Sequence, residues 1–106
     1  TLRGGNGADL LDGGANTDEL FGDAGDDTLL GGSGNDALDG GADNDTVSYA
    51  AVTAGMTISL AAGTATGDGN DTLANIENAI GGTAADSITG STGANRLEGG
   101  AGNDTL

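Results

Sequence analysis

Between residues 4 and 48, single aliphatic residues recur at a fixed period of nine, separated by polar, glycine-rich stretches. The five units read GGNGADLLD, GGANTDELF, GDAGDDTLL, GGSGNDALD and GGADNDTVS. A strand turns alternate side chains to opposite faces, so the last three positions of each unit predict a short strand with one side chain in the core. The first six positions predict a turn. The predicted core residues stand at position eight: Leu11, Leu20, Leu29, Leu38 and Val47.

Two other positions of the unit are invariant in this first block (residues 4–48). Position one is always glycine and position six is always aspartate: Gly4, Gly13, Gly22, Gly31 and Gly40, and Asp9, Asp18, Asp27, Asp36 and Asp45. Tight turns use positive φ, which glycine reaches without steric cost. Position four departs from glycine at Asn16, Asp43 and Ala84; Asn and Asp tolerate the left-handed region, whereas Ala84 is poorly suited to it.

A nine-residue repeat of this form resembles the repeats-in-toxin (RTX) family, whose nonapeptide is G-G-x-G-x-D-x-U-x with U aliphatic. The resemblance implies an all-β fold, a right-handed parallel β-roll in which each coil is made of two nonapeptides. Successive coils stack ~4.8 Å apart. The resemblance also implies that calcium ions lie in the turns, each between two turns that are one full coil apart in the sequence.

The resemblance assigns the calcium ligands to the position-six carboxylates and to carbonyl oxygens in positions one to four. Complete sites pair Asp9 with Asp27, Asp18 with Asp36, and Asp27 with Asp45, and Asp86 with Asp104 makes a weaker fourth. We therefore expect about three to four calcium ions or more, each with several oxygen ligands. The carbonyl ligands would come from Gly4, Gly5, Gly7, Gly13, Gly14, Gly22, Gly25, Gly31, Gly32, Gly34, Gly40 and Gly41.

The period is lost in residues 49–80, which we call the insert. Residues 56–60 alternate apolar and polar positions, as a half-buried strand does. Residues 66–74 look like a degenerate repeat, with Asp71 at position six and Leu73 at position eight. We expect Ile76 and Ile80 to face inward. The repeats resume in a second block, residues 81–106, so the chain predicts one β-roll domain over 1–106 with an irregular β insert.

Stacked coils place the position-six aspartates in two columns, one of Asp9, Asp27 and Asp45 and the other of Asp18 and Asp36, and the sequence of the insert predicts where these columns end. One full coil after Asp36 and Asp45 stand Ala54 and Gly63, so both columns are expected to stop there. Asn95 replaces aspartate in the second block and weakens its column. Glu77 lies one full coil before Asn95 and could be a ligand, although we favour a solvated surface position. The insert shifts the frame of the repeats, so it either bulges out of the roll or forms turns of different length. It is expected to order last or to remain mobile.

Composition adds a reason for metal dependence. The formal net charge is −15, and the chain has only one Met, one Tyr and one Phe, with no Trp. Charge repulsion and a thin core predict a chain that is disordered without metal. The acidic surface argues against nucleic acid, and no apolar run is long enough to span a membrane. The chain has no His, Cys or Lys for a nucleophile–base pair, so we expect no enzyme activity within these residues.

The resemblance implies a secreted, extracellular or cell-surface bacterial protein that leaves the cell through type I secretion machinery. Both ends cut through a repeat, so we expect the chain to be part of a larger polypeptide. Two alternatives remain open. One is an adhesin-type surface that binds polysaccharide or ice, although position seven of the first block carries no continuous threonine row. The other is the C-terminal module of a secreted hydrolase, because residues 76–82 (IENAIGG) resemble serralysin-type metalloproteases.

Overall fold

The structure is a computed structural model that describes all residues 1–106, and it is built from twelve short strands. Most strands span only the three residues around one core side chain, with a few longer exceptions. No segment forms a long apolar helix of the kind that crosses a membrane. The strands are β1 (Leu2–Asn6), β2 (Leu10–Asp12), β3 (Glu19–Ala24), β4 (Thr28–Leu30), β5 (Ala37–Asp39), β6 (Thr46–Ser48), β7 (Thr57–Ser59), β8 (Thr64–Thr66), β9 (Asn70–Ala74), β10 (Asn78–Ile80), β11 (Ser87–Thr89) and β12 (Arg96–Glu98).

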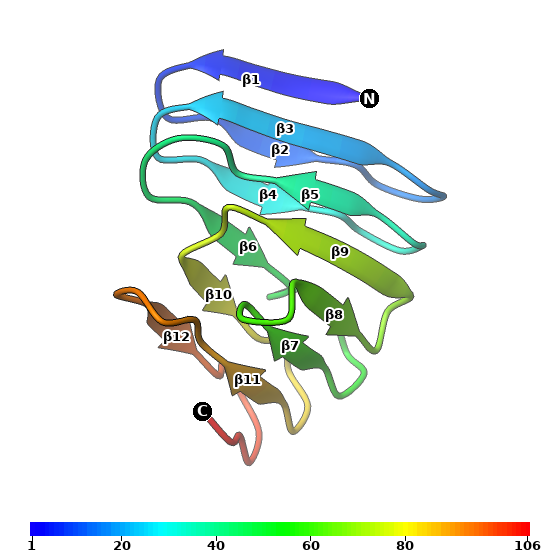
Figure 1. The fold of residues 1–106 in the computed structure, drawn as a ribbon. Coiled ribbons are helices and arrows are strands. Elements are labelled where there is room, and N and C mark those ends of the chain that lie inside the picture. Colours follow the sequence, from blue (N-terminus) through cyan, green and yellow to red (C-terminus); the bar gives the residue numbers. More distant parts are fainter.

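The strands form two sheets that face each other, and the chain passes between them at every turn in its first half (Figure 1). One sheet has the order β1-β3-β5-β9-β8-β7-β11, and the other has the order β12-β10-β6-β4-β2. Parallel neighbours in the first block pair residues one coil apart, as in Leu2 with Leu20 and Leu11 with Leu29. The predicted parallel β-roll, with two nonapeptides in each coil, is therefore confirmed.

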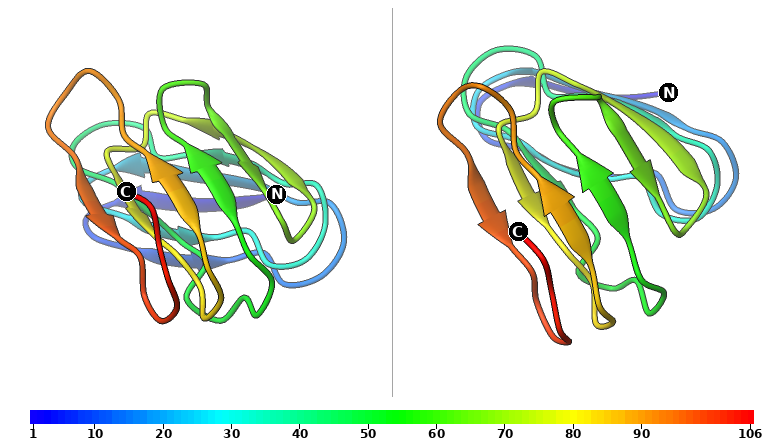
Figure 2. Two further views of the ribbon diagram at one scale, coloured as in Figure 1. Left: turned by 90° about the horizontal axis from the view of Figure 1, so that it is seen from below. Right: turned by 60° about the horizontal axis from the view of Figure 1, so that its bottom comes forward.

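The core is the narrow layer between the two sheets, which the views in Figure 2 show from the end of the roll. Position-eight side chains fill it, because each strand turns only its middle residue inward. Leu20, Leu29 and Val47 have no exposed surface. The remaining buried members of the cluster are Leu11, Leu38, Tyr49, Met56, Ile58, Ala65, Leu73, Ile76, Ala79 and Ile88.

The insert does not bulge out of the roll but supplies strands to both sheets. β8 is antiparallel to both of its neighbours, so β7, β8 and β9 form a meander. β9 then takes the next place beside β5, with Leu73 opposite Leu38, and β10 takes the next place beside β6. The predicted strand in residues 56–60 and the degenerate repeat in residues 66–74 are both present. The prediction for Ile80 is wrong, because Ala79 is the fully buried residue of β10 and Ile80 is only partly buried.

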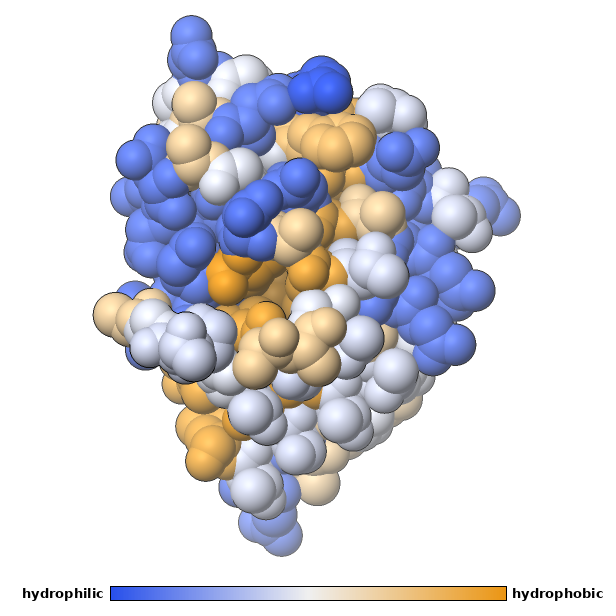
Figure 3. All heavy atoms as spheres, viewed as in Figure 1, coloured by the Kyte–Doolittle hydropathy of each residue, from blue (hydrophilic) through white to orange (hydrophobic).

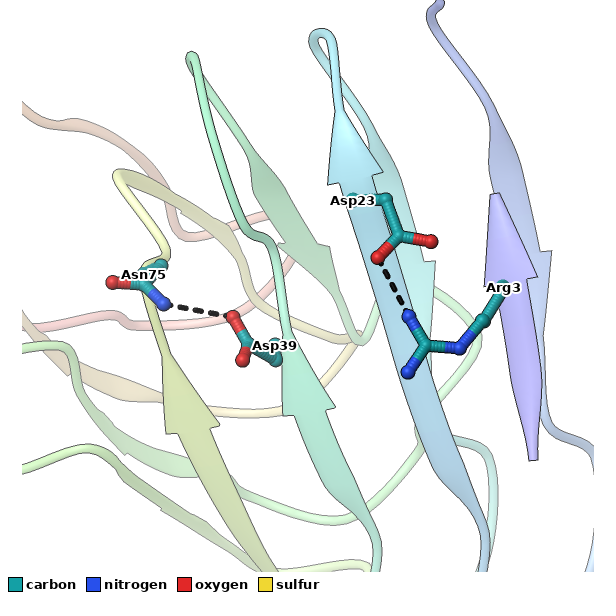
Figure 4. Close-up of polar contacts among 4 residues, drawn as sticks. All are labelled: Arg3, Asp23, Asp39 and Asn75. Carbon is teal, nitrogen blue, oxygen red and sulfur yellow. Dashed lines mark hydrogen bonds and ion pairs between the residues drawn. The ribbon is translucent and has the colours of Figure 1, made fainter. Parts of the chain in front are cut away.

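The outward face of the seven-stranded sheet changes character along the roll. Near the N-terminus it carries charged contacts between coils, such as the ion pair of Arg3 with Asp23 (2.8 Å; Figure 4). The Arg3 guanidinium also lies over the ring of Phe21. Over β7, β8, β9 and β11 it is uncharged, and this lower part of the molecule is mainly pale rather than blue in Figure 3. Sheet pairing aligns the hydroxyl side chains of neighbouring strands there: Thr57 with Thr66 and Ser87, and Thr64 with Ser59 and Thr72.

Candidate metal sites in the turns

The turns of the first block share one backbone conformation, set by positive φ at positions two and four. At position four this holds for Gly7, Gly25 and Gly34, and also for Asn16 and Asp43, whose φ values are 77° and 82°. The tolerance predicted for these two residues is therefore observed, and Ala84 does not adopt a positive φ. Position two has the same sign of φ in every unit of the block: Gly5, Gly14, Asp23, Gly32 and Gly41.

The position-six carboxylates lie in two columns along the roll, and a ladder of hydrogen bonds links the members of each column. The Oδ1 atom of each carboxylate accepts a hydrogen bond from the backbone N–H of the equivalent residue in the preceding coil. Asp27 Oδ1 accepts from Asp9 N–H at 2.8 Å, and Asp45 Oδ1 accepts from Asp27 N–H at 2.8 Å. Asp36 Oδ1 accepts from Asp18 N–H at 2.9 Å in the other column. The structure thus brings together the three pairs that the family resemblance assigns.

The second oxygen of these carboxylates has no partner in the protein. Oδ2 is buried without a hydrogen bond in five residues: Asp9, Asp18, Asp27, Asp36 and Asp45. Asp27 is 1% exposed and Asp45 is 0% exposed. A buried polar atom without a partner costs roughly 1–3 kcal/mol, and more when it is charged. Such a cost repeated at equivalent positions indicates that the atoms serve a ligand.

Backbone carbonyls line the same spaces between coils. A Cβ placed on Gly4 would lie 2.8 Å from Asp9 Oδ2 and 2.7 Å from the carbonyl oxygen of Gly22 in the next coil. The carbonyl oxygens of Gly7 and Gly14, at positions four and two, point the other way, against Gly25 and Gly32. Side chains at these glycines would therefore fill a space bounded by oxygen atoms. The position-one residues Gly13, Gly22, Gly31 and Gly40 also lie beside the Oδ2 atom of their own unit.

This oxygen set fits a hard cation such as calcium. No three acidic side chains gather around one point, so most ligands would have to be carbonyl oxygens. Calcium accepts six to eight oxygen ligands from carboxylates and carbonyls in flexible geometry. The glycines provide these carbonyls because a bulkier residue at position one, or at Gly25 and Gly32, would collide with them.

Electrostatics in the columns also favour a cation. Burial raises the pKa of Asp45, and the charges of Asp27 and Glu77 raise it further. Burial also raises the pKa of Asp71, although hydrogen bonds from Asp36 N–H and the Tyr49 hydroxyl act in the opposite direction. A raised pKa in the folded state means that ionisation above the usual pKa range opposes folding. A bound cation would offset this effect.

The first two turns of the second block differ from those of the first block, whereas the turn of residues 99–104 keeps positive φ at Gly100 and Gly102. Asp86 and Asp104 do lie together, with Asp104 Oδ1 accepting the N–H of Asp86 at 2.9 Å. The Oδ2 atom of Asp86, however, accepts the N–H of Gly82 in its own turn at 2.7 Å. Asn95 closes its turn in the same way, by accepting the N–H of Ser91 at 2.7 Å. These turns meet their hydrogen-bonding needs internally.

The rule that each coil contains two nonapeptides did not place two residues in the columns, Asp71 and Glu77. Asp71 Oδ1 accepts the N–H of Asp36 at 2.8 Å, and Glu77 Oε2 accepts the N–H of Asp45 at 2.9 Å. The expectation that both columns stop after Asp36 and Asp45 is therefore wrong, and Glu77 is a part-buried hydrogen-bonding partner rather than a solvated side chain. Asp71 could have been found from its place in the degenerate repeat. Glu77 left two signals, its place one full coil before Asn95 and its place two residues before the buried Ala79.

Fold and turns together define a class of protein, a calcium-binding β-roll assembled from nonapeptides. A model of the RTX calcium-binding nonapeptide repeat matches residues 1–29, 12–47 and 76–106, which is most of the chain. The chain belongs to this family. Among curated proteins, none matches the chain.

Proposed function

We propose that this chain is a calcium-binding β-roll module of a secreted bacterial protein and that it folds when it meets calcium after export. The observation that carries the proposal is the set of five buried, unpartnered Oδ2 atoms in the first block. Ionised carboxylates are costly to bury without a counter-charge, so the folded state of this block depends on a cation. The five oxygens belong to Asp9, Asp18, Asp27, Asp36 and Asp45.

The residues of the chain create this dependence. The formal net charge is −15, and the carboxylates of each column lie one coil apart, ~4.8 Å, so repulsion opposes closure of the roll. Calcium, when bound, supplies positive charge and links oxygens of two coils. A ligand that binds only the folded state adds about 2.7 kcal/mol per site at a concentration 100-fold above its dissociation constant.

The family context supports a location outside the cytosol. Calcium sites of extracellular modules have dissociation constants of about 10⁻⁴ to 10⁻³ M, and we assign these sites to that range. In the low-calcium cytosol the chain stays unfolded, which suits passage through type I secretion machinery. The module then forms part of a larger polypeptide at the cell surface or in the medium. Any catalytic activity belongs to other parts of that polypeptide.

Far-ultraviolet circular dichroism tests this proposal. With excess chelator the spectrum should be mostly that of a coil, and millimolar calcium should convert it to that of β structure. Magnesium should substitute poorly, because it requires shorter, near-octahedral bonds and gives up its water reluctantly. A β spectrum in chelator that calcium leaves unchanged would refute the proposal.

A second candidate function is adhesion to a neutral polysaccharide, which the uncharged hydroxyl face over β7, β8, β9 and β11 favours. Hydroxyl groups on neighbouring strands repeat every ~4.8 Å and can exchange hydrogen bonds with sugar hydroxyls. The alignment arises because the antiparallel meander brings threonines of the insert side by side, which the repeat pattern alone did not predict. The residues are Thr57, Ser59, Thr64, Thr66, Thr72, Ser87 and Thr89.

Co-sedimentation with insoluble cellulose or chitin tests this second function. Replacement of Thr64 by lysine places a charge in the hydroxyl face and should abolish retention on the polysaccharide. Leu10→Lys is the matched control, because Leu10 is 73% exposed on the other sheet. Equal retention of the two variants, or no retention of the unaltered chain, would exclude this function for the face.

A further inference from the structure

We infer that the chain holds two additional calcium sites where the period of nine is broken, one between Asp36 and Asp71 and one between Asp45 and Glu77. The inference rests on the proposed calcium-binding function and extends it to residues that the repeat pattern does not assign. Asp36 is 3% exposed and Asp45 is 0% exposed, and the Oδ2 atom of each is unpartnered. Both oxygens lie on the last first-block coil of their column, so their ligand must be shared with the insert.

The Asp36–Asp71 site reproduces the geometry of the regular sites. Asp71 Oδ1 accepts the N–H of Asp36 at 2.8 Å, as position-six residues do along the ladders. The turn of residues 66–71 has positive φ at Gly67 (134°) and Gly69 (101°), which are positions two and four of the degenerate repeat. The carbonyl oxygen of Gly34 points against Gly69, just as that of Gly7 points against Gly25. A separation of 35 in place of the regular 18 thus preserves the position-six hydrogen bond and the position-four carbonyl contact, whereas Gly67 at position two lies against Gly55 of the insert.

The Asp45–Glu77 site uses a different turn but places oxygens in corresponding positions. Glu77 Oε2 accepts the N–H of Asp45 at 2.9 Å. The carbonyl oxygen of Asn75 lies against Gly40, where a position-one carbonyl lies in the regular coils. Asn75 has a φ of 52°, and its side chain donates to Asp39 Oδ1 at 2.8 Å (Figure 4). The extra methylene of glutamate lets its carboxylate reach the ladder from this altered turn.

The structure also explains why these two sites are the last of their columns. The hydroxyl of Tyr49 donates to Asp71 Oδ2 at 2.7 Å, so this oxygen has a protein partner where Asp36 has none. In the other column Asn95 Nδ2 donates to the backbone carbonyl of Glu77 at 2.7 Å. In the first column a protein donor thus occupies the carboxylate oxygen that a further ion would use, and in the second the next residue, Asn95, brings an amide without charge. The five unpartnered Oδ2 atoms therefore equal in number the three regular sites of the first block plus the two inferred sites at its junction with the insert.

Calcium stoichiometry measured on the full chain tests the inference. Equilibrium dialysis at saturating calcium, followed by metal analysis, should find at least five ions per folded chain. Glu77→Gln and Asp71→Asn should each hold one ion fewer. Glu77→Asp keeps the charge but removes the methylene that lets the carboxylate reach Asp45 N–H, so it should not recover the lost ion. The matched controls Glu19→Gln and Asp12→Asn remove the same charges from exposed positions and should bind as the unaltered chain does.

Terbium luminescence provides a second readout that does not depend on counting ions. Tyr49 is the only tyrosine and the chain has no tryptophan, so emission sensitised by the protein reports ions close to Asp71. The unaltered chain should show strong sensitised emission, and Asp71→Asn should lose most of it while Asp12→Asn retains it. Three or four ions in the unaltered chain, with no change in Glu77→Gln, would overturn the inference while leaving the calcium-binding function intact. No bound calcium at all would overturn both.

Discussion

The turns of the first block and the first two turns of the second block differ in how they satisfy position six. In the first block the Oδ2 atoms of residues such as Asp27 and Asp45 are buried and unpartnered. In the second block Asp86 and Asn95 accept N–H groups from their own turns. The turns of residues 81–86 and 90–95 also lack positive φ at positions two and four. One period can therefore specify two kinds of turn, one suited to a cation and one closed by the protein itself.

The difference traces to a few residues. Ala84 stands at position four, and its Cβ disfavours the left-handed region that Gly, Asn and Asp adopt in the first block. Without that conformation, the N–H of Gly82 turns toward Asp86 and closes the turn. Gly93 stands at position four of the next unit but does not adopt a positive φ either. Glycine permits the cation-binding turn and does not by itself enforce it.

The largest expected effect is the calcium response of the whole first block. Three linked sites would stabilise the first block by about 8 kcal/mol at a calcium concentration 100-fold above the dissociation constant. The amides of β4 and β5 should therefore be protected from hydrogen exchange first, and over a narrow range of calcium concentration. Because β9 and β10 pair directly with β5 and β6, they should gain protection together with the first block rather than last. Hydrogen exchange across a calcium titration measures this. Protection of β11 and β12 at a lower calcium concentration than β4 and β5 would contradict this expectation.

Alanine at Asp27 should do more harm than alanine at Asp9. Asp27 contributes to two sites of its column and Asp9 to one. At a calcium concentration 100-fold above the dissociation constant, the stabilisation by calcium should therefore fall by about 5 kcal/mol in Asp27→Ala and by about 3 kcal/mol in Asp9→Ala. Calcium titrations followed by circular dichroism give the midpoints. Asp86→Ala extends the comparison to the second block and should shift the midpoint least. Equal midpoints for Asp27→Ala and Asp9→Ala would disprove the shared-ligand arrangement.

Alanine at position four should separate the two kinds of turn. Gly25 has a positive φ, which a residue with a Cβ disfavours, and the new Cβ would also meet the carbonyl of Gly7. We therefore expect Gly25→Ala to lower the free energy of unfolding by about 2–5 kcal/mol. Gly93 has no positive φ and open space around it, so Gly93→Ala should be neutral or stabilising by up to about 1 kcal/mol. Thermal unfolding in calcium distinguishes them. A similar loss in both variants would mean that the turns are alike.

The smallest expected effect comes from the Tyr49 hydroxyl. Tyr49→Phe leaves Asp71 Oδ2 buried without a donor, which should cost about 1–3 kcal/mol. The aromatic packing is retained, so the loss should appear in stability and not in the number of calcium ions bound. Chemical denaturation with and without calcium, together with equilibrium dialysis, measures both quantities. A variant as stable as the unaltered chain would show that this hydrogen bond does not close the column.

The nonapeptide pattern predicted the strands, the core residues and the coil-to-coil pairing of the first block, because each unit repeats its own local chemistry. It could not predict the antiparallel place of β8, since its sequence Thr-Ala-Thr is compatible with either direction of pairing. Nor could the pattern predict the pairing of Glu77 with Asp45, because their separation of 32 residues is not a multiple of nine. Ile80 was predicted to face inward because it is the larger side chain. Ala79 is the middle residue of β10 and is therefore the one that is buried.

The break in the repeat has a consequence for the speed of folding. Asp18 and Asp36 meet across a sequence separation of 18, whereas Asp36 and Asp71 meet across a separation of 35. Each doubling of a closed loop adds only about 0.6 kcal/mol of chain entropy, so this coil should close more slowly by a factor of about three. The antiparallel hairpin therefore adds little to the mean sequence separation of contacts that governs the folding rate. A roll of this kind can accept such an insertion between two coils with only a small kinetic penalty.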